Sequence, residues 1–146
     1  MSSYAEFLQS KRRVFVCRGF MPGPLPEGLF DWQAHIVRWA CLQGVAAILA
    51  DTGLGKTAMQ LALAAAVAQH TGCRVLVLTP LAVGAQTERE AAKFGIDAAH
   101  MTTRTVPDAP IVILNYERLH YLTDLSLFAG IVLDESSILK SYMGKT

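Results

Sequence analysis

A glycine-bearing loop between an apolar run and a helical segment constrains this chain more than any other feature. Residues 45–50 are mostly apolar, residues 51–55 read Asp-Thr-Gly-Leu-Gly, and Lys-Thr opens an alanine- and leucine-rich stretch. This order is typical of a phosphate-binding loop, in which backbone N–H groups and a helix amino terminus converge on an anion. Gly53 and Gly55 have no Cβ, so their backbone can take positive φ and approach phosphate oxygens closely.

The side chains of this loop predict a nucleotide with its magnesium ion. Lys56 is expected to reach the β- and γ-phosphates, and the Thr57 hydroxyl is expected to hold Mg²⁺. The residues expected to surround the phosphates are Thr52, Gly53, Leu54, Gly55, Lys56, Thr57 and Ala58. The usual pattern begins with glycine, whereas Ala50 stands here, and a plain glycine turn between a strand and a helix is the alternative.

The composition predicts a globular protein without a membrane segment. The chain has 146 residues, of which 52% are hydrophobic and 17% charged, as expected of one packed domain. A net charge of +1 means that any nucleic-acid binding must come from local patches. Three widely spaced cysteines favour a reducing cytoplasm over a disulfide framework or a metal site. Residues 61–68 form the longest apolar run, far below the ~18 residues of a membrane span.

Buried-looking apolar runs alternate with helical segments, which predicts an α/β fold with a mostly parallel sheet flanked by helices. Strands are expected at 45–50, 74–79, 111–114 and 131–133, with an edge strand near 99–102, and helices at 32–43, 56–70 and 82–94. In the first helix, Asp31 is the expected N-cap. Its buried face is expected to hold Trp32, Ile36, Trp39 and Ala40. Residues 1–28 are expected to form an N-terminal adaptor segment ahead of the main domain.

Two carboxylates follow the last expected strand and supply the second half of a nucleotide site. Asp134 stands where it can bind the Mg²⁺ that Thr57 also holds, and Glu135 where it can polarise an attacking water. Taken alone, such a pair is more simply a solvated strand end. Together with the glycine loop, it predicts hydrolysis of a nucleoside triphosphate with Lys56, Asp134 and Glu135 as the catalytic residues.

At this point the sequence resembles superfamily 2 helicases. Residues 50–57, 79–81 and 134–140 look like motifs I, Ia and II of that family, and the Leu-Gly-Lys-Thr and Leu-Lys endings point to its Swi/Snf-like branch. The Asp-Glu-Ser-Ser form at 134–137 is similar to helicases encoded by bacteriophages, as are residues 30–33 and 113–119. The resemblance covers residues 29–146 and implies a RecA-like P-loop NTPase domain, the first of two in such enzymes.

The resemblance implies further roles for single residues. Gln33 occupies the place of a glutamine that reads adenine, which favours ATP, although a surface helix residue is the alternative. Four residues match segments that lie against nucleic acid: Thr79, Pro80, Asn115 and Tyr116. For Tyr116, a packed aromatic ring is the competing interpretation. The Asp-Glu-Ser-Ser form departs from the commoner Asp-Glu-Ala-His, which leaves the role of Ser137 open.

The resemblance also implies that the domain is incomplete, because the chain ends shortly after motif II. In related folds, a later strand inserts between the Asp-Glu strand and the phosphate-loop strand, and a second RecA-like domain supplies arginine fingers and half of the DNA track. We therefore expect the ATP-binding portion of a DNA helicase or translocase, weak or inactive alone, in the cytoplasm, which is that of the host if the protein is phage-encoded. The alternative is a non-catalytic module that docks on a protein or DNA. A P-loop kinase is less favoured, because Glu135 directly follows Asp134.

Overall fold

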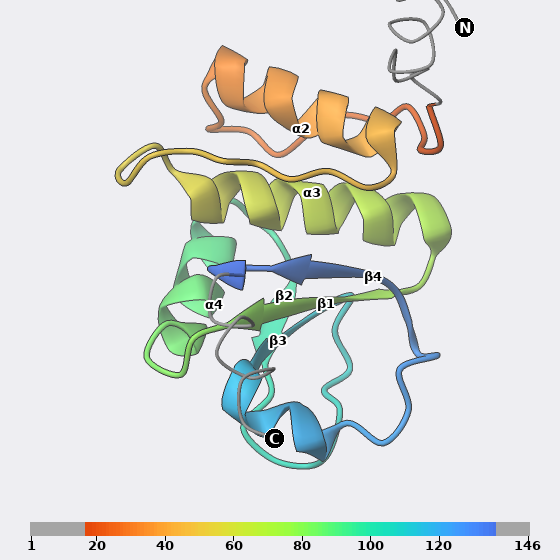
Figure 1. Cartoon of the computed structure of the whole chain (residues 1–146), viewed down its shortest axis with the longest axis vertical. Helices are drawn as coiled ribbons and strands as arrows, with labels where there is room; N and C mark the ends of the chain where they lie inside the picture. Colours follow the sequence, from red (N-terminus) through yellow and green to blue (C-terminus); the bar gives the residue numbers. More distant parts are fainter. Residues whose placement is uncertain (1–16, 137–146) are drawn as a thin grey trace, which may run out of the picture.

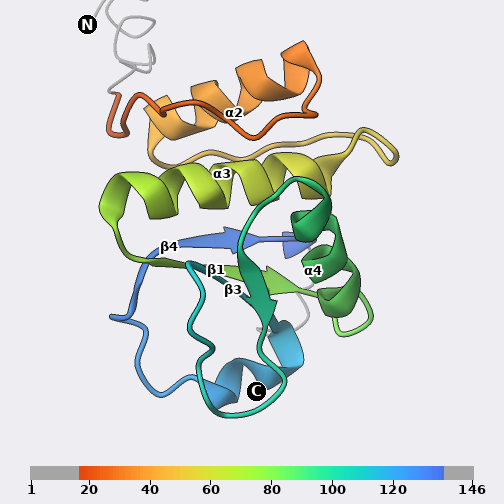
Figure 2. The ribbon, with the colours of Figure 1, turned by 180° about the vertical axis from the view of Figure 1, so that it is seen from behind.

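The computed structural model describes residues 17–136 and shows an α/β fold with a four-stranded, all-parallel sheet. The strands are β1 (Arg74–Thr79), β2 (Ala98–His100), β3 (Ile111–Asn115) and β4 (Phe128–Leu133), in the spatial order β2-β3-β1-β4. The helices are α2 (Asp31–Gln43), α3 (Lys56–Thr71), α4 (Gly84–Lys93) and the 3-10 helix η1 (Tyr116–Tyr121). Figure 1 and Figure 2 show α3 lying between α2 and the sheet. The expected α/β class and parallel sheet are confirmed.

The two central strands are buried on both faces, as their continuous apolar sequences predict. Val75 and Val77 point toward α3 and α4, whereas Leu76 and Leu78 point to the opposite face. This alternation follows from the two-residue period of a strand. The second face is covered by Tyr116 of η1 and by loop residues, and η1 lies below the sheet in Figure 1. Because these strands are parallel, the carboxyl ends of β1, β3 and β4 lie along one edge of the sheet.

Helix α3 is apolar on most of its surface because it is packed on two sides. It contacts α2 on one side and β1, β3 and β4 on the other. Its buried residues are Met59, Leu61, Ala62, Ala64, Ala66 and Ala68. Gly72 ends the helix in the left-handed conformation, with φ of 67°. The expected helix at 56–70 is confirmed, and its amino terminus directly follows the glycine loop.

Residues 45–50 do not form the expected first core strand. The segment is extended but unpaired, and Val45 and Leu49 are 89% and 99% exposed. Ile48 and Ala50 instead pack against buried residues of α2 and α3. A strand needs a hydrogen-bonded neighbour, and within residues 17–136 the sheet ends at β4. The prediction of a first core strand at 45–50 is therefore wrong, and only Ile48 and Ala50 of this run contact the core.

The buried face of α2 also differs from the expected one. Its buried residues are Gln33, Val37, Ala40 and Cys41. Trp32 and Trp39 are 42% and 40% exposed. The observed buried residues lie one position further along the helix than the predicted ones. The small side chains of Ala40 and Cys41 permit α2 to pack close to α3. The helix begins one residue earlier than expected, because Phe30 is the N-cap and Asp31 is the first helical residue.

The described part of the N-terminal segment is attached to the end of α2. The Gly19 and Phe20 amides donate to the carbonyls of Leu42 and Cys41, over 3.1 and 3.0 Å. Phe20 and Leu25 pack against the cluster that α2 and α3 share. Among residues 17–136, no helix is both long enough and apolar enough to cross a bilayer. Ser137 and the residues that follow it in the expected motif II lie outside the described residues.

Candidate functional site

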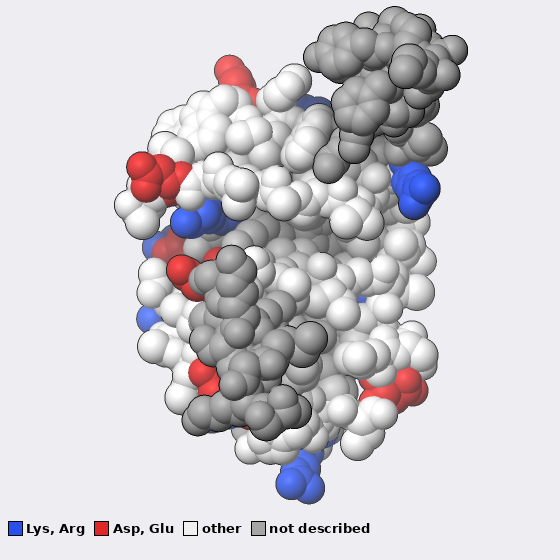
Figure 3. Space-filling view, viewed as in Figure 1, with Lys and Arg blue, Asp and Glu red and all other residues white. Residues whose placement is uncertain are grey.

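The candidate site lies at one end of the molecule, where α3 begins and β4 ends. Ligand sites of open parallel sheets typically lie beyond the carboxyl ends of the strands. In both Figure 1 and Figure 2 the amino terminus of α3 lies on the same side as the tip of β4. Figure 3 shows side chains of both charges gathered at the left margin, the side on which these two ends lie.

The glycines of the loop have the backbone conformation expected of a phosphate cradle. Gly53 and Gly55 have φ angles of 79° and 69°, in the region that favours glycine. A Cβ built on Gly53 would meet no atom within 4 Å, so the space in front of it is open. A Cβ on Gly55 would lie 2.5 Å from Gln33 Nε2, so a side chain there would displace Gln33. The loop thus exposes its backbone and is closed from behind by Gln33.

The amino terminus of α3 lacks the acidic residues that usually stabilise a first turn. No Asp or Glu is present there, and Lys56 adds a positive charge to the positive end of the helix dipole. Lys56 Nζ donates to the Ala50 carbonyl over 3.1 Å, which folds this side chain back along the loop. Thr57 and Ala58 follow it, half-buried. Such an uncompensated helix end favours a bound anion.

Gln33 connects helix α2 to the loop. Its Nε2 donates to the Leu54 carbonyl over 3.1 Å, and its Oε1 accepts a hydrogen bond from the Phe30 amide over 3.0 Å. The side chain is only 4% exposed, which contradicts the alternative of a surface helix residue. The adenine-reading role stays a prediction. One Nε2 hydrogen is left for a base, because the other atoms of the amide are used within the protein.

Asp134 lies beside the first turns of α3. Its Oδ1 accepts a 2.9 Å hydrogen bond from Gln60 Nε2, although the two residues are 74 positions apart. Gln60 follows Thr57 by three residues and therefore lies on the same face of the helix. The Asp134 amide donates to the Leu78 carbonyl over 2.9 Å, continuing the pairing of β1 and β4. Asp134 is half-buried and held at three points, because Tyr116 also donates to its carbonyl.

Glu135 adopts a backbone conformation that is uncommon for its residue type. Its φ is 53°, and it is the one non-glycine residue with positive φ among residues 17–136. Such a conformation costs about 1–3 kcal/mol and is concentrated at functional sites. The side chain is exposed, next to the half-buried Asp134. The turn therefore presents two adjacent carboxyl groups in different environments.

The residues at this site fit a magnesium ion shared with phosphates. Within residues 17–136, no group of three or more His, Cys, Asp or Glu residues is placed to hold a metal ion. Mg²⁺ does not need such a cage, since it is typically bound through one or two protein ligands, substrate phosphates and several waters. The Gln60 Oε1 atom is shielded from solvent next to the Asp134 contact and has no hydrogen-bond partner among residues 17–136. An unpaired acceptor at this position is consistent with a hydrated cation.

The four residues expected to lie against nucleic acid are mostly buried. Thr79 and Asn115 are fully buried and Tyr116 nearly so, which leaves Pro80 as the accessible one. Asn115 Nδ2 donates to Thr79 Oγ1 and to the carbonyls of Pro80 and Leu81, over 3.0 to 3.4 Å. In this structure these residues shape the loop after β1, and the packed-aromatic interpretation describes Tyr116. Direct contact of these side chains with nucleic acid stays untested.

The pKa of the Tyr116 hydroxyl, which lies near the site, is raised strongly. Its ring is buried below the sheet, and its hydroxyl faces the turn of Asp134 and Glu135. Burial, followed by the charges of Asp134 and Glu135, raises the pKa of Tyr116 to about 12. The hydroxyl therefore stays protonated at neutral pH and remains a hydrogen-bond donor to the Asp134 carbonyl.

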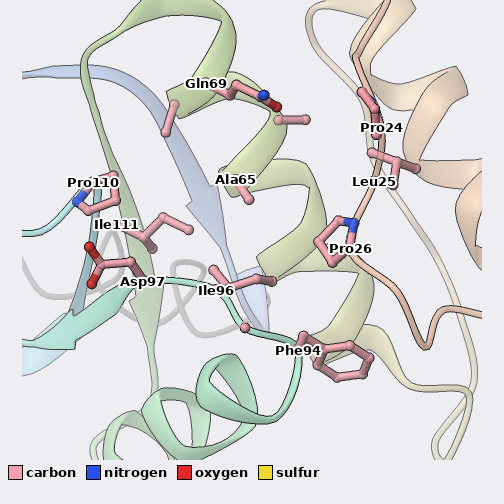
Figure 4. A pocket seen from close by; sticks show the side chains of 13 residues that line it. Pro24, Leu25, Pro26, Ala65, Gln69, Phe94, Ile96, Asp97, Pro110 and Ile111 are labelled. Carbon is pink, nitrogen blue, oxygen red and sulfur yellow. The ribbon is translucent and has the colours of Figure 1, made fainter.

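A pocket lies away from the candidate site. It has a volume of about 420 Å³ and is lined by residues of the N-terminal segment, α3 and the start of β3. Figure 4 shows Pro26, Ala65, Phe94 and Ile96 around it. Asp97 is its one charged lining residue. Because Ile111 begins β3 and Asn115 ends it, this pocket lies at the opposite end of the strand from the glycine loop.

Comparison with known proteins adds no relative: the chain matches no protein-family model and no curated sequence. The assignment of the site therefore depends on its own residues. Sequence reasoning missed Gln60, although a signal was present. Gln60 is the one polar residue from Ala58 to Ala68 of the helix, three positions after Thr57.

Proposed function

We propose that this chain is the ATP-binding portion of a nucleic-acid-dependent ATPase of the superfamily 2 helicase type, with a RecA-like fold. It would bind Mg-ATP between the glycine loop and the acidic pair. Together with a second RecA-like domain, it would couple hydrolysis to movement on DNA. The Gln60–Asp134 hydrogen bond is the observation that carries the proposal, since it joins the acidic turn to the helix that the glycine loop opens.

The proposed roles follow from the chemistry of each side chain. The loop amides and Lys56 bind the phosphates, while Thr57 and Asp134 hold Mg²⁺, which neutralises charge on the phosphate oxygens when bound. Glu135 orients the attacking water, and its exposed position beside Asp134 supports this role. Gln33 supports the loop and offers its remaining N–H to adenine.

The test combines binding and turnover. A fluorescent ATP analogue is titrated with Mg²⁺ into the wild type, Lys56→Ala and Lys93→Ala, the last being a matched control on the exposed part of α4. Lys56→Ala should weaken binding by about 10–100-fold, as expected for loss of a charge-assisted hydrogen bond. Lys93→Ala should bind as the wild type does. Equal affinity of all three proteins would overturn the proposal.

One observation favours a second function, that of a non-catalytic docking module. Strand β4 is the edge of the sheet, and Ile131 and Leu133 are 51% and 41% exposed on it. Much of the face viewed in Figure 3 is uncharged where grey residues do not cover it. An exposed apolar edge strand is a template for pairing with another chain. This alternative predicts no turnover with DNA and Mg²⁺ in excess, and no change on Glu135→Gln.

A further inference from the structure

Gln60 is a half-buried polar side chain, and one end of its amide has no hydrogen-bond partner among the described residues. Its Nε2 donates to Asp134 Oδ1 over 2.9 Å. Its Oε1 atom is shielded from solvent and has no partner among the described residues. Buried acceptors without a donor are rare in folded proteins, and each one needs an explanation.

The chemistry of the neighbouring group fixes the orientation of this amide. An ionised carboxylate only accepts hydrogen bonds, so Asp134 can take only the NH₂ end of Gln60. Turning the amide over would place Oε1 against Asp134 Oδ1 and replace a hydrogen bond with the repulsion of two oxygen atoms. The unpaired Oε1 therefore lies on the side of the amide that the Asp134 carboxylate does not occupy.

We propose that Gln60 is a positioning residue of the magnesium site, which holds the Asp134 carboxylate through Nε2 and accepts a hydrogen bond from a metal-bound water at Oε1. This inference rests on the proposed function, because it requires a metal ion beside Thr57 and Asp134. Mg²⁺ in proteins keeps several of its waters, and these are strong donors. Because Oε1 is closed to a water-sized donor in this structure, the contact forms only when the side chains around it move as the metal binds.

A purely structural role makes a different prediction. If Gln60 only ties α3 to β4, removing its amide changes stability and leaves the dependence of nucleotide binding on Mg²⁺ unchanged. If Gln60 orients a metal ligand, removing the amide weakens metal binding. Partners that orient metal ligands typically contribute about 10–100-fold in metal affinity. The Mg²⁺ dependence therefore separates the two roles.

The experiment uses the full chain as wild type, Gln60→Met and Gln69→Met. Gln69 lies on the same helix, exposed and far from the acidic turn, and receives the same substitution. Binding of a non-hydrolysable fluorescent ATP analogue is measured against Mg²⁺ concentration, and again with the metal chelated. Gln60→Met should raise the Mg²⁺ concentration for half-maximal binding by about 10-fold or more. Its metal-free affinity, and all values of Gln69→Met, should equal those of the wild type.

A second readout does not depend on the variant. The side-chain amide signals of Gln60, identified in NMR spectra by their loss in Gln60→Met or by direct assignment, should shift only when Mg²⁺ and nucleotide are both present. A wild type that binds Mg-nucleotide without that shift, or a Gln60→Met protein with wild-type Mg²⁺ dependence, would overturn this inference alone. A wild type without any Mg²⁺-dependent binding would overturn the proposed function and the inference with it.

Discussion

The Tyr116 hydroxyl donates a 2.6 Å hydrogen bond to the backbone carbonyl of Asp134. This contact joins the residue that follows β3 to the turn that follows β4. It fixes the backbone of the candidate metal ligand from below the sheet, while Gln60 fixes its carboxylate from α3. Asp134 is therefore positioned by side chains from both faces of the sheet.

The shifted pKa of Tyr116 predicts how stability changes at high pH. Between pH 10 and about 12 the folded protein keeps the Tyr116 proton, whereas the unfolded chain releases it. The stabilisation linked to this proton is complete below pH 10 and is lost as the pH rises toward about 12. An absorbance titration of tyrosinate should show a component near 12 that Tyr116→Phe removes and Tyr121→Phe retains. Retention of that component in Tyr116→Phe would contradict the assignment.

Asn115 is expected to be essential for the shape of the loop after β1. Its amide donates to three oxygens of residues 79–81, and its Oδ1 lies 2.9 Å from His100 Nε2. Asn115→Ala removes these hydrogen bonds and leaves the buried Thr79 hydroxyl without its partner, so it should lower the free energy of unfolding by about 2–3 kcal/mol. Gln86→Ala, on the exposed side of α4, should change it by less than about 0.5 kcal/mol. Urea denaturation compares the two, and equal effects would show that the network contributes nothing.

The backbone conformation of Glu135 predicts that substitutions at this position affect stability and ATP turnover differently. Its φ of 53° favours glycine over residues with a side chain. Glu135→Gly should therefore be more stable than Glu135→Ala by about 1 kcal/mol, after allowance for the greater freedom of glycine in the unfolded chain. Both variants should lack ATP turnover while binding nucleotide. Thermal unfolding with and without the ATP analogue measures both effects, and a more stable Ala variant would contradict the strained backbone.

The sequence was sufficient to predict the elements that are buried on all sides. Continuous apolar runs identified β1 and β3, and the alanine-rich stretch identified α3, because extensive burial leaves few polar residues to obscure the pattern. The apolar run at 131–133 identified only part of β4, which lies at the edge of the described sheet and has exposed and half-buried residues in alternation. Residues 45–50 have a similar apolar run, but pairing depends on a neighbour that lies elsewhere in the chain. Apolar content alone could not decide whether that neighbour was present.

The candidate site was predictable in its local parts and not in its long-range contacts. The glycine loop and its positive φ angles follow from local sequence. The burial of Thr79, Asn115 and Tyr116 depends on loops that pack from distant positions. The partnership of Gln60 and Asp134 crosses 74 positions and requires the register of β1 against β4. Sequence motifs therefore predict which residues lie at the candidate site better than they predict which residues contact them.

The proposed site requires that the Lys56–Thr57 pair and the Asp134–Glu135 pair surround one metal–nucleotide complex. Mn²⁺ can replace Mg²⁺ at oxygen ligands and broadens the NMR signals of nearby nuclei. With Mn²⁺ and a non-hydrolysable ATP analogue, we predict broadening of the backbone amide signals of both pairs, with those of Gln69 and Asp97 unaffected. Broadening at one pair without the other would contradict the shared site.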